Sequence, residues 1–341
     1  VIAVIINHTY SPILPNGFLG VDIFFVISGF VLTLSLEAKR NKNLIEFLTN
    51  FFYRRIKRLL PALLVFCLIT AIIITFLIPS PKFAHITGIT GLLGFSNLYL
   101  LNGSTDYFAT DVILNPFTHT WSLDVEEQFY LIFPFLIWFS GFGSQKYHGK
   151  KNLFYTMLFL SSLSLIFYVY LTINYPISSY YLMPARFWEM GAGSILFLIY
   201  KFKNILISKI SQIPSGLFLI SISVIMLLPI KNLSINTFLI VFLTIALILS
   251  LKEENFISRI FNCRIANHLG LISYSLYLWH WAILSISAWT IGVHWWTIPF
   301  QFGIIYFVSL LSFKYVEQPF RKNNILRKKW KLFASSLFLV F

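Results

Sequence analysis

A histidine and an aspartate near the start of the chain have the residue types of a general-base pair. His8 ends the first apolar run, and Asp22 lies near the start of the next one. A hairpin of two helices joined by residues 9–17 would bring both side chains to a similar depth. A carboxylate beside an imidazole fixes the imidazole tautomer and strengthens it as a base. We therefore expect His8 to be the catalytic base and Asp22 to orient it. A headgroup-level histidine and a helix-capping aspartate would give the same pattern.

Two arginines have the spacing of a phosphate-binding pair. Arg55 and Arg58 are three residues apart, so they share one face of a helix, and they precede a long apolar stretch. Paired guanidinium groups bind phosphates bidentately, which predicts a cofactor site at these residues. The alternative is contact with lipid headgroups, because basic clusters at the inner face of a membrane commonly bind them.

Acidic and aromatic side chains follow His119 and lead into another apolar stretch. Trp121, Glu126 and Glu127 belong to this segment, and we expect them to line a substrate cleft for a sugar. The helix macrodipole alone also favours acids at a helix N-terminus, so a helix start explains the same pattern.

Three more ionisable residues lie inside apolar stretches, where such groups are rare and mark candidate functional sites. Arg186 and Glu189 are spaced i,i+3, which predicts a self-neutralising ion pair that can also shape the substrate side. His280 stands between two tryptophans, and we expect a hydrogen-bonded core histidine. The only cysteines are Cys67 and Cys263; their spacing suggests no metal site, and we expect no disulfide.

The composition identifies the elements that must position these residues. The 341-residue chain is 57% hydrophobic and only 11% charged, whereas about a quarter of the residues in a soluble domain are charged. This excludes an ordinary soluble enzyme, a nucleic-acid-binding domain and a disordered chain. Apolar stretches of about 20 residues recur along the chain, which predicts an all-α, polytopic transmembrane helical bundle.

We expect about ten or eleven spans and one re-entrant segment. The predicted spans are 1–8, 18–36, 59–78, 128–141, 153–173, 184–200, 214–230, 236–251, 268–289, 298–313 and 332–341, of which the first and the last are incomplete. Segment 86–101 is apolar but short, and it contains Gly88, Gly91 and Gly94. We therefore expect it to re-enter the membrane without crossing it.

The distribution of Lys and Arg sets the expected orientation. They concentrate in segments 37–58, 142–152, 201–213, 252–267 and 314–331. The positive-inside rule places these segments in the cytoplasm. The N-terminus is then cytoplasmic and the C-terminus emerges outside. Segment 102–127 contains acids but no Lys or Arg, and it is expected outside.

Several strings together resemble the acyltransferase family 3 of bacterial membrane proteins, the O-antigen acetylase type. The matching strings are FLGVDIFFVISGF, FFYRRIKRLLPALL, HTWSLDVEEQFYLIFP, RFWEMGAGSIL, ISYSLYLWHWAIL and YVEQPFRK. They occur in the family's order and span nearly the whole chain. The resemblance implies an O-acetyltransferase of the bacterial inner membrane. It would transfer acetyl from cytoplasmic acetyl-CoA to a hydroxyl of a surface polysaccharide such as lipopolysaccharide O-antigen.

The resemblance also implies roles for individual residues. The family's functional histidine matches His8, its Arg-x-x-Arg motif matches Arg55 and Arg58, and its outer Glu-Glu pair matches Glu126 and Glu127. Residues 1–331 would form the acyltransferase transmembrane domain. Residues 332–341 would begin a further span that leads, in full-length relatives, to a periplasmic SGNH-type domain.

We expect acetyl-CoA, a lipid-linked or surface carbohydrate and membrane lipids as partners, with no metal and no nucleic acid. The default mechanism is direct transfer to the acceptor hydroxyl. The alternative function is a proton-coupled transporter or an exporter of a lipid-linked glycan, in which buried His, Asp and Glu form a proton relay.

Overall fold

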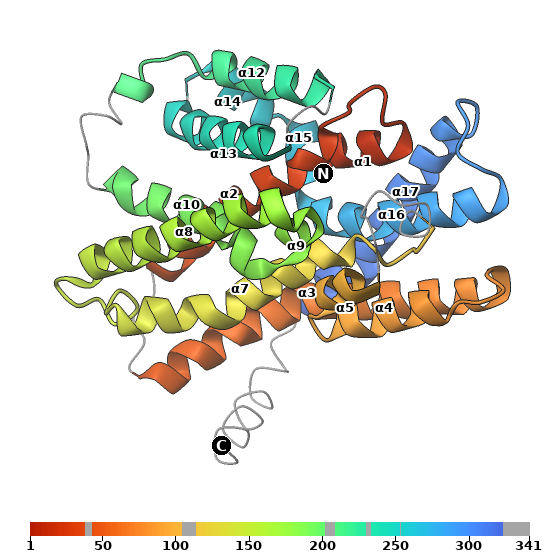
Figure 1. The fold of residues 1–341 in the computed structure, drawn as a ribbon, viewed down its shortest axis with the longest axis horizontal. Coiled ribbons are helices and arrows are strands. Elements are labelled where there is room, and N and C mark those ends of the chain that lie inside the picture. The colour runs from red at the N-terminus through yellow and green to blue at the C-terminus, as the bar shows by residue number, and fades with distance from the viewer. Residues whose placement is uncertain (38–42, 104–113, 202–208, 230–232, 253, 323–341) are drawn as a thin grey trace. The chain divides into compact units, whose positions relative to one another are not determined.

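The computed structural model describes residues 1–37, 43–103, 114–201, 209–229, 233–252 and 254–322. Every regular element within these ranges is a helix (Figure 1), which confirms the predicted all-α class. The predicted span at 332–341 and residues 104–113 of the acidic segment lie outside the described residues.

The chain divides into two compact units. The first comprises Val1–Ala38, Leu101–Tyr107 and Lys150–Ser273, and the second comprises Lys39–Leu100, Phe108–Gly149 and Tyr274–Phe341. The helices of the first unit are α1 (Ile2–Thr9), η1 (Gly17–Leu19), α2 (Gly20–Glu37), α8 (Gly149–Asn174), α9 (Pro176–Tyr181), α10 (Met183–Lys201), α12 (Ser215–Leu227), α13 (Leu233–Ser250), α14 (Phe256–Phe261) and α15 (Arg264–Leu271). Those of the second are α3 (Leu44–Leu77), α4 (Lys82–Leu92), α5 (Ser96–Gly103), α7 (Thr120–Phe139), α16 (Ser273–Thr290), α17 (Ile298–Ser312), η2 (Phe313–Glu317) and α18 (Gln318–Lys322).

Long apolar helices make this a multi-pass membrane protein. Among the described residues, five helices are long and apolar enough to cross a membrane: Gly17–Glu37, Leu44–Leu77, Gly149–Asn174, Leu233–Ser250 and Ile298–Lys322. The bent pair Arg264–Leu271 and Ser273–Thr290 would be a sixth. The sequence predicts more spans because it also counts α7 and α10, which contain charged residues, and α12, which has only 13 residues.

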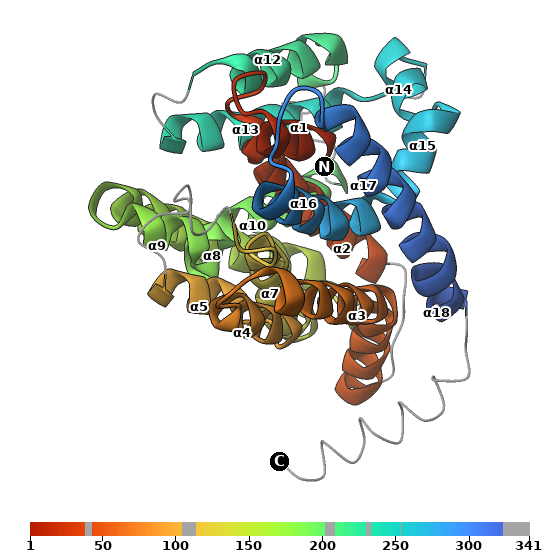
Figure 2. The same cartoon turned by 90° about the vertical axis from the view of Figure 1, so that its right-hand side faces the viewer.

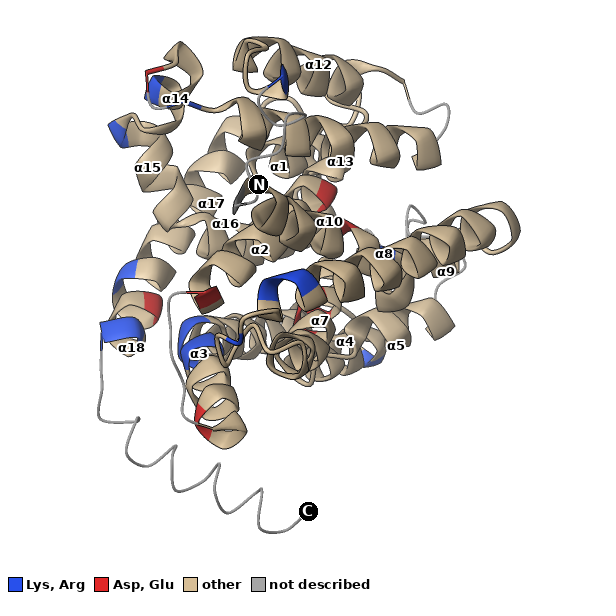
Figure 3. Cartoon of the chain, turned by 90° about the vertical axis from the view of Figure 1, so that its left-hand side faces the viewer, with Lys and Arg blue, Asp and Glu red and all other residues tan. Residues whose placement is uncertain are grey.

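The surface of α3 shows why such helices need lipid. Leu68, Ile72 and Phe76 follow one another at i,i+4 spacing and are 61%, 60% and 85% exposed. An exposed apolar stripe of this kind is costly in water and suits a lipid environment. Figure 3 shows that most of the helical ribbon carries no charge and that basic residues lie on α3, α14, α15 and α18.

In the first unit, two glycines let α2 and α10 pack as close parallel neighbours. A Cβ atom on Gly29 would lie 1.9 Å from the Met190 carbonyl oxygen, and one on Gly193 would lie 1.9 Å from the Val26 carbonyl oxygen. Only glycine permits backbones to approach so closely, as is common between membrane helices.

In the second unit, α3 packs along α4, α7 and α16, and Figure 2 shows α3 and α4 side by side. Phe66 of α3 is fully buried, and its ring contacts those of Phe117 and Trp279. The Tyr274 hydroxyl of α16 donates to the Leu59 carbonyl at 3.0 Å.

The segment predicted to be re-entrant consists of two short helices, α4 and α5. The chain breaks between them at Gly94, which has a φ of +80°, a conformation that favours glycine. Gly88 and Gly91 lie within α4, where a Cβ would crowd Phe117 and Thr120 respectively. The structure thus confirms a break in this segment but places it at one of the three glycines.

Candidate active site

Arg55 lies on α3 with its guanidinium group stacked on aromatic rings. Its Cζ atom is 4.4 Å from the ring centroid of Tyr130 and 5.9 Å from that of Phe51. Stacking on aromatic faces attracts a guanidinium group and holds it in place. Helix α3 begins at the cap Asn43, whose side chain accepts a hydrogen bond from the Glu46 backbone N–H at 2.8 Å.

A tyrosine connects this arginine to one of the two predicted acids. The Tyr130 hydroxyl donates to Glu126 Oε1 one turn earlier on α7, and Arg55 Nη1 lies 3.4 Å from the same hydroxyl oxygen. Both Tyr130 and Glu126 are buried, with 5% exposure each. Arg55, Tyr130 and Glu126 therefore form one connected group, which we call the Arg55–Tyr130–Glu126 group.

This group corrects the expectation that Arg55 lies at the inner face and Glu126 at the outer face. Helices α3 and α7 run antiparallel: Phe47 packs on Trp138, with ring centroids 5.5 Å apart, and Phe66 packs on His119, also at 5.5 Å. This register puts Arg55 level with Tyr130. Loop charges indicate the side of a loop, but they do not determine which residues of two helices lie level.

The adjacent carboxylates Glu126 and Glu127 have different surroundings. Glu127 is partly exposed. Its Oε2 atom faces Gly94 at the break between α4 and α5, and it would lie 3.3 Å from a Cβ atom added to that glycine. Glu126 instead points to Tyr130. The pair predicted to act together therefore divides between two places.

The second predicted arginine, Arg58, is exposed on α3. The positive charges of Arg58 and Arg321 both stabilise the Glu317 carboxylate. Glu317 is buried in η2, a π-helical turn, and π-bulges are frequent at functional sites. Its carboxylate accepts from Arg321 Nη1 and from Ser275 Oγ, each at 3.2 Å.

Two residues of these contacts, Tyr130 and Glu317, are not predicted from the sequence to belong to a site. Tyr130 stands in an apolar run that reads as ordinary span sequence, and the one local signal is its i,i+4 spacing from Glu126. Glu317 appears in one of the quoted strings, but its partner Ser275 is 42 residues away in the sequence.

Two histidines lie in a buried cluster at the start of α7. The His119 and His280 ring centroids are 5.5 Å apart. His280 Nδ1 is 2.6 Å from the Tyr277 carbonyl oxygen, which confirms the prediction of a hydrogen-bonded core histidine. The Tyr277 hydroxyl donates to the His119 carbonyl at 3.1 Å and lies 2.5 Å from Ser122 Oγ.

The same end of α7 contains Trp121 and Asp124. Trp121 is only 1% exposed, so it packs in the core here and presents no surface to a sugar, contrary to the role expected for it. Asp124 is also 1% exposed, and it accepts hydrogen bonds from the backbone N–H and the hydroxyl of Ser96. Asp124 thereby caps the start of α5.

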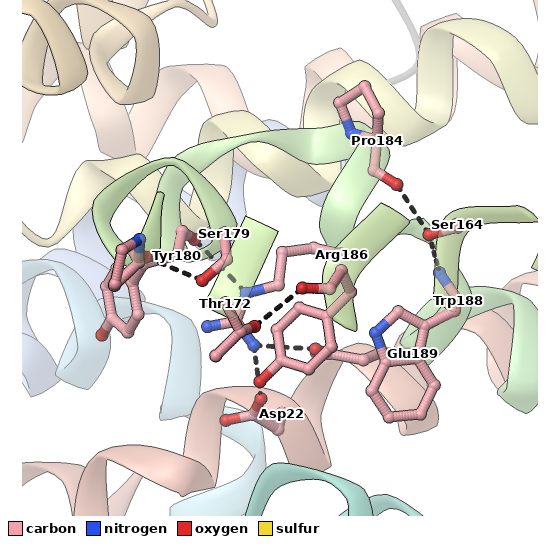
Figure 4. A network of polar contacts seen from close by, with 11 residues as sticks. Asp22, Ser164, Thr172, Ser179, Tyr180, Pro184, Arg186, Trp188 and Glu189 are labelled. Atoms are coloured by element: carbon pink, nitrogen blue, oxygen red, sulfur yellow. Dashed lines mark hydrogen bonds and ion pairs between the residues drawn. The ribbon is translucent and has the colours of Figure 1, made fainter. Parts of the chain in front are cut away.

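In the first unit, Arg186 binds two carboxylates (Figure 4). Its Nη1 atom lies 2.7 Å from Asp22 Oδ1 and 2.7 Å from Glu189 Oε1. Its Nε atom donates to the Tyr180 carbonyl at 3.3 Å, and the guanidinium group stacks on the Tyr180 ring. All three charged residues are at most 3% exposed. The predicted Arg186–Glu189 pair is confirmed, and Asp22 joins it.

Asp22 binds Arg186 in the structure, and its role in orienting His8 stays a prediction. A hairpin of α1 and α2 does form, because residues before and after the loop lie in contact. A Cβ atom added to Gly20 would lie 2.9 Å from Val4 Cγ2, and one added to Gly17 would lie 2.8 Å from Asn7 Cβ. The helices are thus antiparallel at this point. In this register His8 lies toward the loop and Asp22 toward the start of α1.

His8 itself occupies the last turn of α1 and is partly exposed. The loop after it is held closed by Asn7, whose Nδ2 donates to the carbonyls of Leu14 and Pro15 at 2.8 and 3.0 Å. His8 therefore lies at the turn end of the hairpin, with its Nε2 atom buried.

The described ranges contain no group of three His, Cys, Asp or Glu side chains that could hold a metal ion. The second unit offers a guanidinium group beside a carboxylate, and such a guanidinium group can bind phosphate. The first unit offers an imidazole, which can accept a proton.

Comparison with known proteins identifies relatives along nearly the whole chain. A family model described as an acyltransferase domain matches residues 1–316. The chain is 28% identical over 347 residues to the peptidoglycan O-acetyltransferase OatA of Listeria monocytogenes, with 96% of this chain covered. It is also 28% identical over 371 residues to the O-acetyltransferase OatA of Staphylococcus aureus (strain MRSA252). The chain spans between 55% and 59% of the length of the curated relatives that it matches. No solved structure matches it.

Proposed function

Because the chain belongs to the acyltransferase 3 family, we propose that it transfers an acetyl group from acetyl-CoA to a hydroxyl group of a cell-envelope glycan. The observation that carries this proposal is the Arg55–Tyr130–Glu126 group, which holds the partly exposed Arg55 guanidinium group against the buried Tyr130. A fixed guanidinium group suits the bidentate binding of a phosphate, and acetyl-CoA is a phosphate-bearing acetyl donor.

The donor side of the reaction is assigned to Arg55 and Arg58. Both side chains come from α3, three residues apart on one helix face. They would bind CoA phosphates at the cytoplasmic side, and the pantetheine arm would extend between helices to carry the thioester toward the acceptor. The thioester supplies an activated carbonyl, so this step consumes no ATP.

The acceptor side is assigned to His8 as general base. The acceptor hydroxyl oxygen attacks the thioester carbonyl while the imidazole takes the hydroxyl proton. The carbon–sulfur bond then breaks, and the proton passes to the departing CoA thiolate. Glu127, which faces the α4–α5 break, is proposed to contact the sugar.

Peptidoglycan is the acceptor to test first. One relative carries the name peptidoglycan O-acetyltransferase, which favours peptidoglycan over the lipopolysaccharide O-antigen expected from the sequence. We place the enzyme in the bacterial inner membrane with a cytoplasmic N-terminus, as the loop charges indicate.

A second function is favoured by one observation in the first unit. Asp22, Arg186 and Glu189 combine two carboxylates with one guanidinium group at buried positions of α2 and α10, and buried groups of this kind within a membrane mark proton relays in pumps and transporters. A proton-coupled transporter or glycan exporter is therefore the competing proposal.

One experiment separates the two functions. The purified full-length chain in nanodiscs is given acetyl-CoA radiolabelled in the acetyl group, together with peptidoglycan fragments or lipopolysaccharide. We expect the label to enter peptidoglycan and free CoA to accumulate in equal amount. Label in lipopolysaccharide alone would change the acceptor, and no transfer to either glycan would overturn the proposed function in favour of transport.

A further inference from the structure

We infer that Glu126 and Tyr130 are positioning residues of the donor site, which hold the Arg55 guanidinium group in place for a phosphate of acetyl-CoA. This inference rests on the proposed function and changes the role of Glu126, which the sequence assigns to the sugar. The group lies within the second unit, between α3 and α7.

Two aromatic rings restrain the Arg55 side chain. An arginine side chain has many rotamers, and binding a phosphate requires one of them. The Tyr130 ring at 4.4 Å and the Phe51 ring at 5.9 Å restrict the guanidinium plane. A guanidinium group has five N–H donors, so donors other than the one that faces Tyr130 remain available to phosphate oxygens.

The Tyr130 hydroxyl group connects Glu126 to Arg55. Because its hydrogen goes to Glu126 Oε1, its oxygen lone pairs are available to accept from Arg55 Nη1, which lies 3.4 Å away. A carboxylate acceptor makes the hydroxyl bond stronger than a neutral one would. Glu126 thus acts on Arg55 through Tyr130, in a chain whose hydrogen bonds reinforce one another.

The adjacent acids Glu126 and Glu127 differ in exposure and in what they face. Glu126 is 5% exposed, and its Oε1 atom accepts a hydrogen bond from Tyr130. Little of its side chain is therefore accessible to a large polar ligand. Glu127 is partly exposed and faces Gly94. Glu126 therefore belongs to the donor site, and Glu127 remains a candidate for contact with the sugar.

The test uses the full chain in nanodiscs and measures KM for acetyl-CoA and KM for the glycan separately. Tyr130→Phe keeps the ring and removes the hydroxyl. We expect it to raise KM for acetyl-CoA about 2- to 12-fold, the range of one net hydrogen bond, and to leave KM for the glycan unchanged. The matched control is Tyr53→Phe on α3, because the buried Tyr53 hydroxyl has no hydrogen-bond partner within the described part of the chain. This control should leave both KM values unchanged.

Glu126 is tested with two substitutions. Glu126→Ala should raise KM for acetyl-CoA as Tyr130→Phe does, and Glu126→Gln should restore part of the loss because an amide oxygen still accepts from the hydroxyl. The double variant Glu126→Ala with Tyr130→Phe should be no worse than either single variant, since residues that act through one bond are not additive.

The outcomes separate this inference from the proposed function. If the wild-type chain transfers acetyl groups but Glu126→Ala raises KM for the glycan alone, the positioning role is overturned and the function stands. If Tyr130→Phe and Tyr53→Phe raise KM for acetyl-CoA equally, the effect belongs to general packing and the inference fails. A wild-type chain that transfers no acetyl group overturns both.

Discussion

The guanidinium group of Arg186 binds the Asp22 carboxylate at 2.7 Å, and the two residues come from neighbouring helices, α10 and α2. Seven residues later on the same helices, Gly193 and Gly29 allow the backbones to touch. About two helical turns therefore separate the ion pair from the closest approach. The charged contact and the glycine contact together fix how the two helices pack.

This relationship predicts a structural role for Asp22. Asp22→Leu leaves the buried Arg186 with one carboxylate fewer, and removing one partner of a buried ion pair costs about 3–5 kcal/mol. We expect a lower free energy of unfolding, measured by denaturant titration in detergent micelles, and a lower yield of folded protein. A variant that keeps its stability but loses acetyl transfer would instead return Asp22 to the reaction.

The glycine contact predicts a steric effect on the same helix pair. Gly193→Ala places a Cβ 1.9 Å from the Val26 carbonyl oxygen, so the helices must separate, at a cost of about 1–3 kcal/mol for an overpacked site. Gly303→Ala on α17 is the matched control, since a Cβ there has nothing within 4 Å. The melting temperature should fall for the first variant and stay level or rise for the second. Equal melting temperatures would show that α2 and α10 are not packed so closely.

The arginine pair predicts a loss of donor binding. Arg55→Ala or Arg58→Ala each removes a charge-assisted contact, of about 1.5–3 kcal/mol, or about 10- to 150-fold in Kd for acetyl-CoA. Arg55→Lys should recover only part of it, because an ammonium group lacks the planar fork. Isothermal titration with acetyl-CoA measures the change. Normal binding by both alanine variants, with activity lost, would assign the arginines to another step.

The imidazole of His8 predicts a loss of chemistry without a loss of binding. His8→Ala should reduce acetyl transfer about 10²- to 10⁴-fold, while Kd for acetyl-CoA and the melting temperature stay at wild-type values because His8 is partly exposed at the end of α1. Transfer and binding are measured on the same preparation. Near wild-type transfer by this variant would end the assignment, and the buried His119 and His280 would be the next candidates.

The loop charges predict which exposed residues face the cytoplasm. In a Cys263→Ser background, a cysteine at Tyr147 should be protected from an impermeant thiol reagent in intact spheroplasts, and one at Trp295 should react. Both side chains are well exposed, at 95% and 84%, so protection reports the membrane and not burial. Labelling at 147 and protection at 295 would reverse the predicted orientation.

The sequence by itself determines the class of this protein and its local contacts. Low charge and long apolar runs require membrane helices, since too few polar residues are available to cover a soluble surface. The Arg186–Glu189 pair follows from i,i+3 spacing, and the break at Gly94 follows from the glycines of its segment. Each of these features depends on residues that are close in sequence, where helix geometry fixes the distances.

Only the tertiary structure decides which residues of different helices meet. It pairs Asp22 with Arg186 of another helix, and it puts Arg55 beside Tyr130 although the loop charges separate Arg55 from Glu126. The physical reason is that helix register depends on how side chains and glycines pack between neighbouring helices, as at Gly29 and Phe66. Hydrophobic periodicity places a residue on a face of its own helix, but it leaves that helix free to slide along its neighbour until packing selects one register.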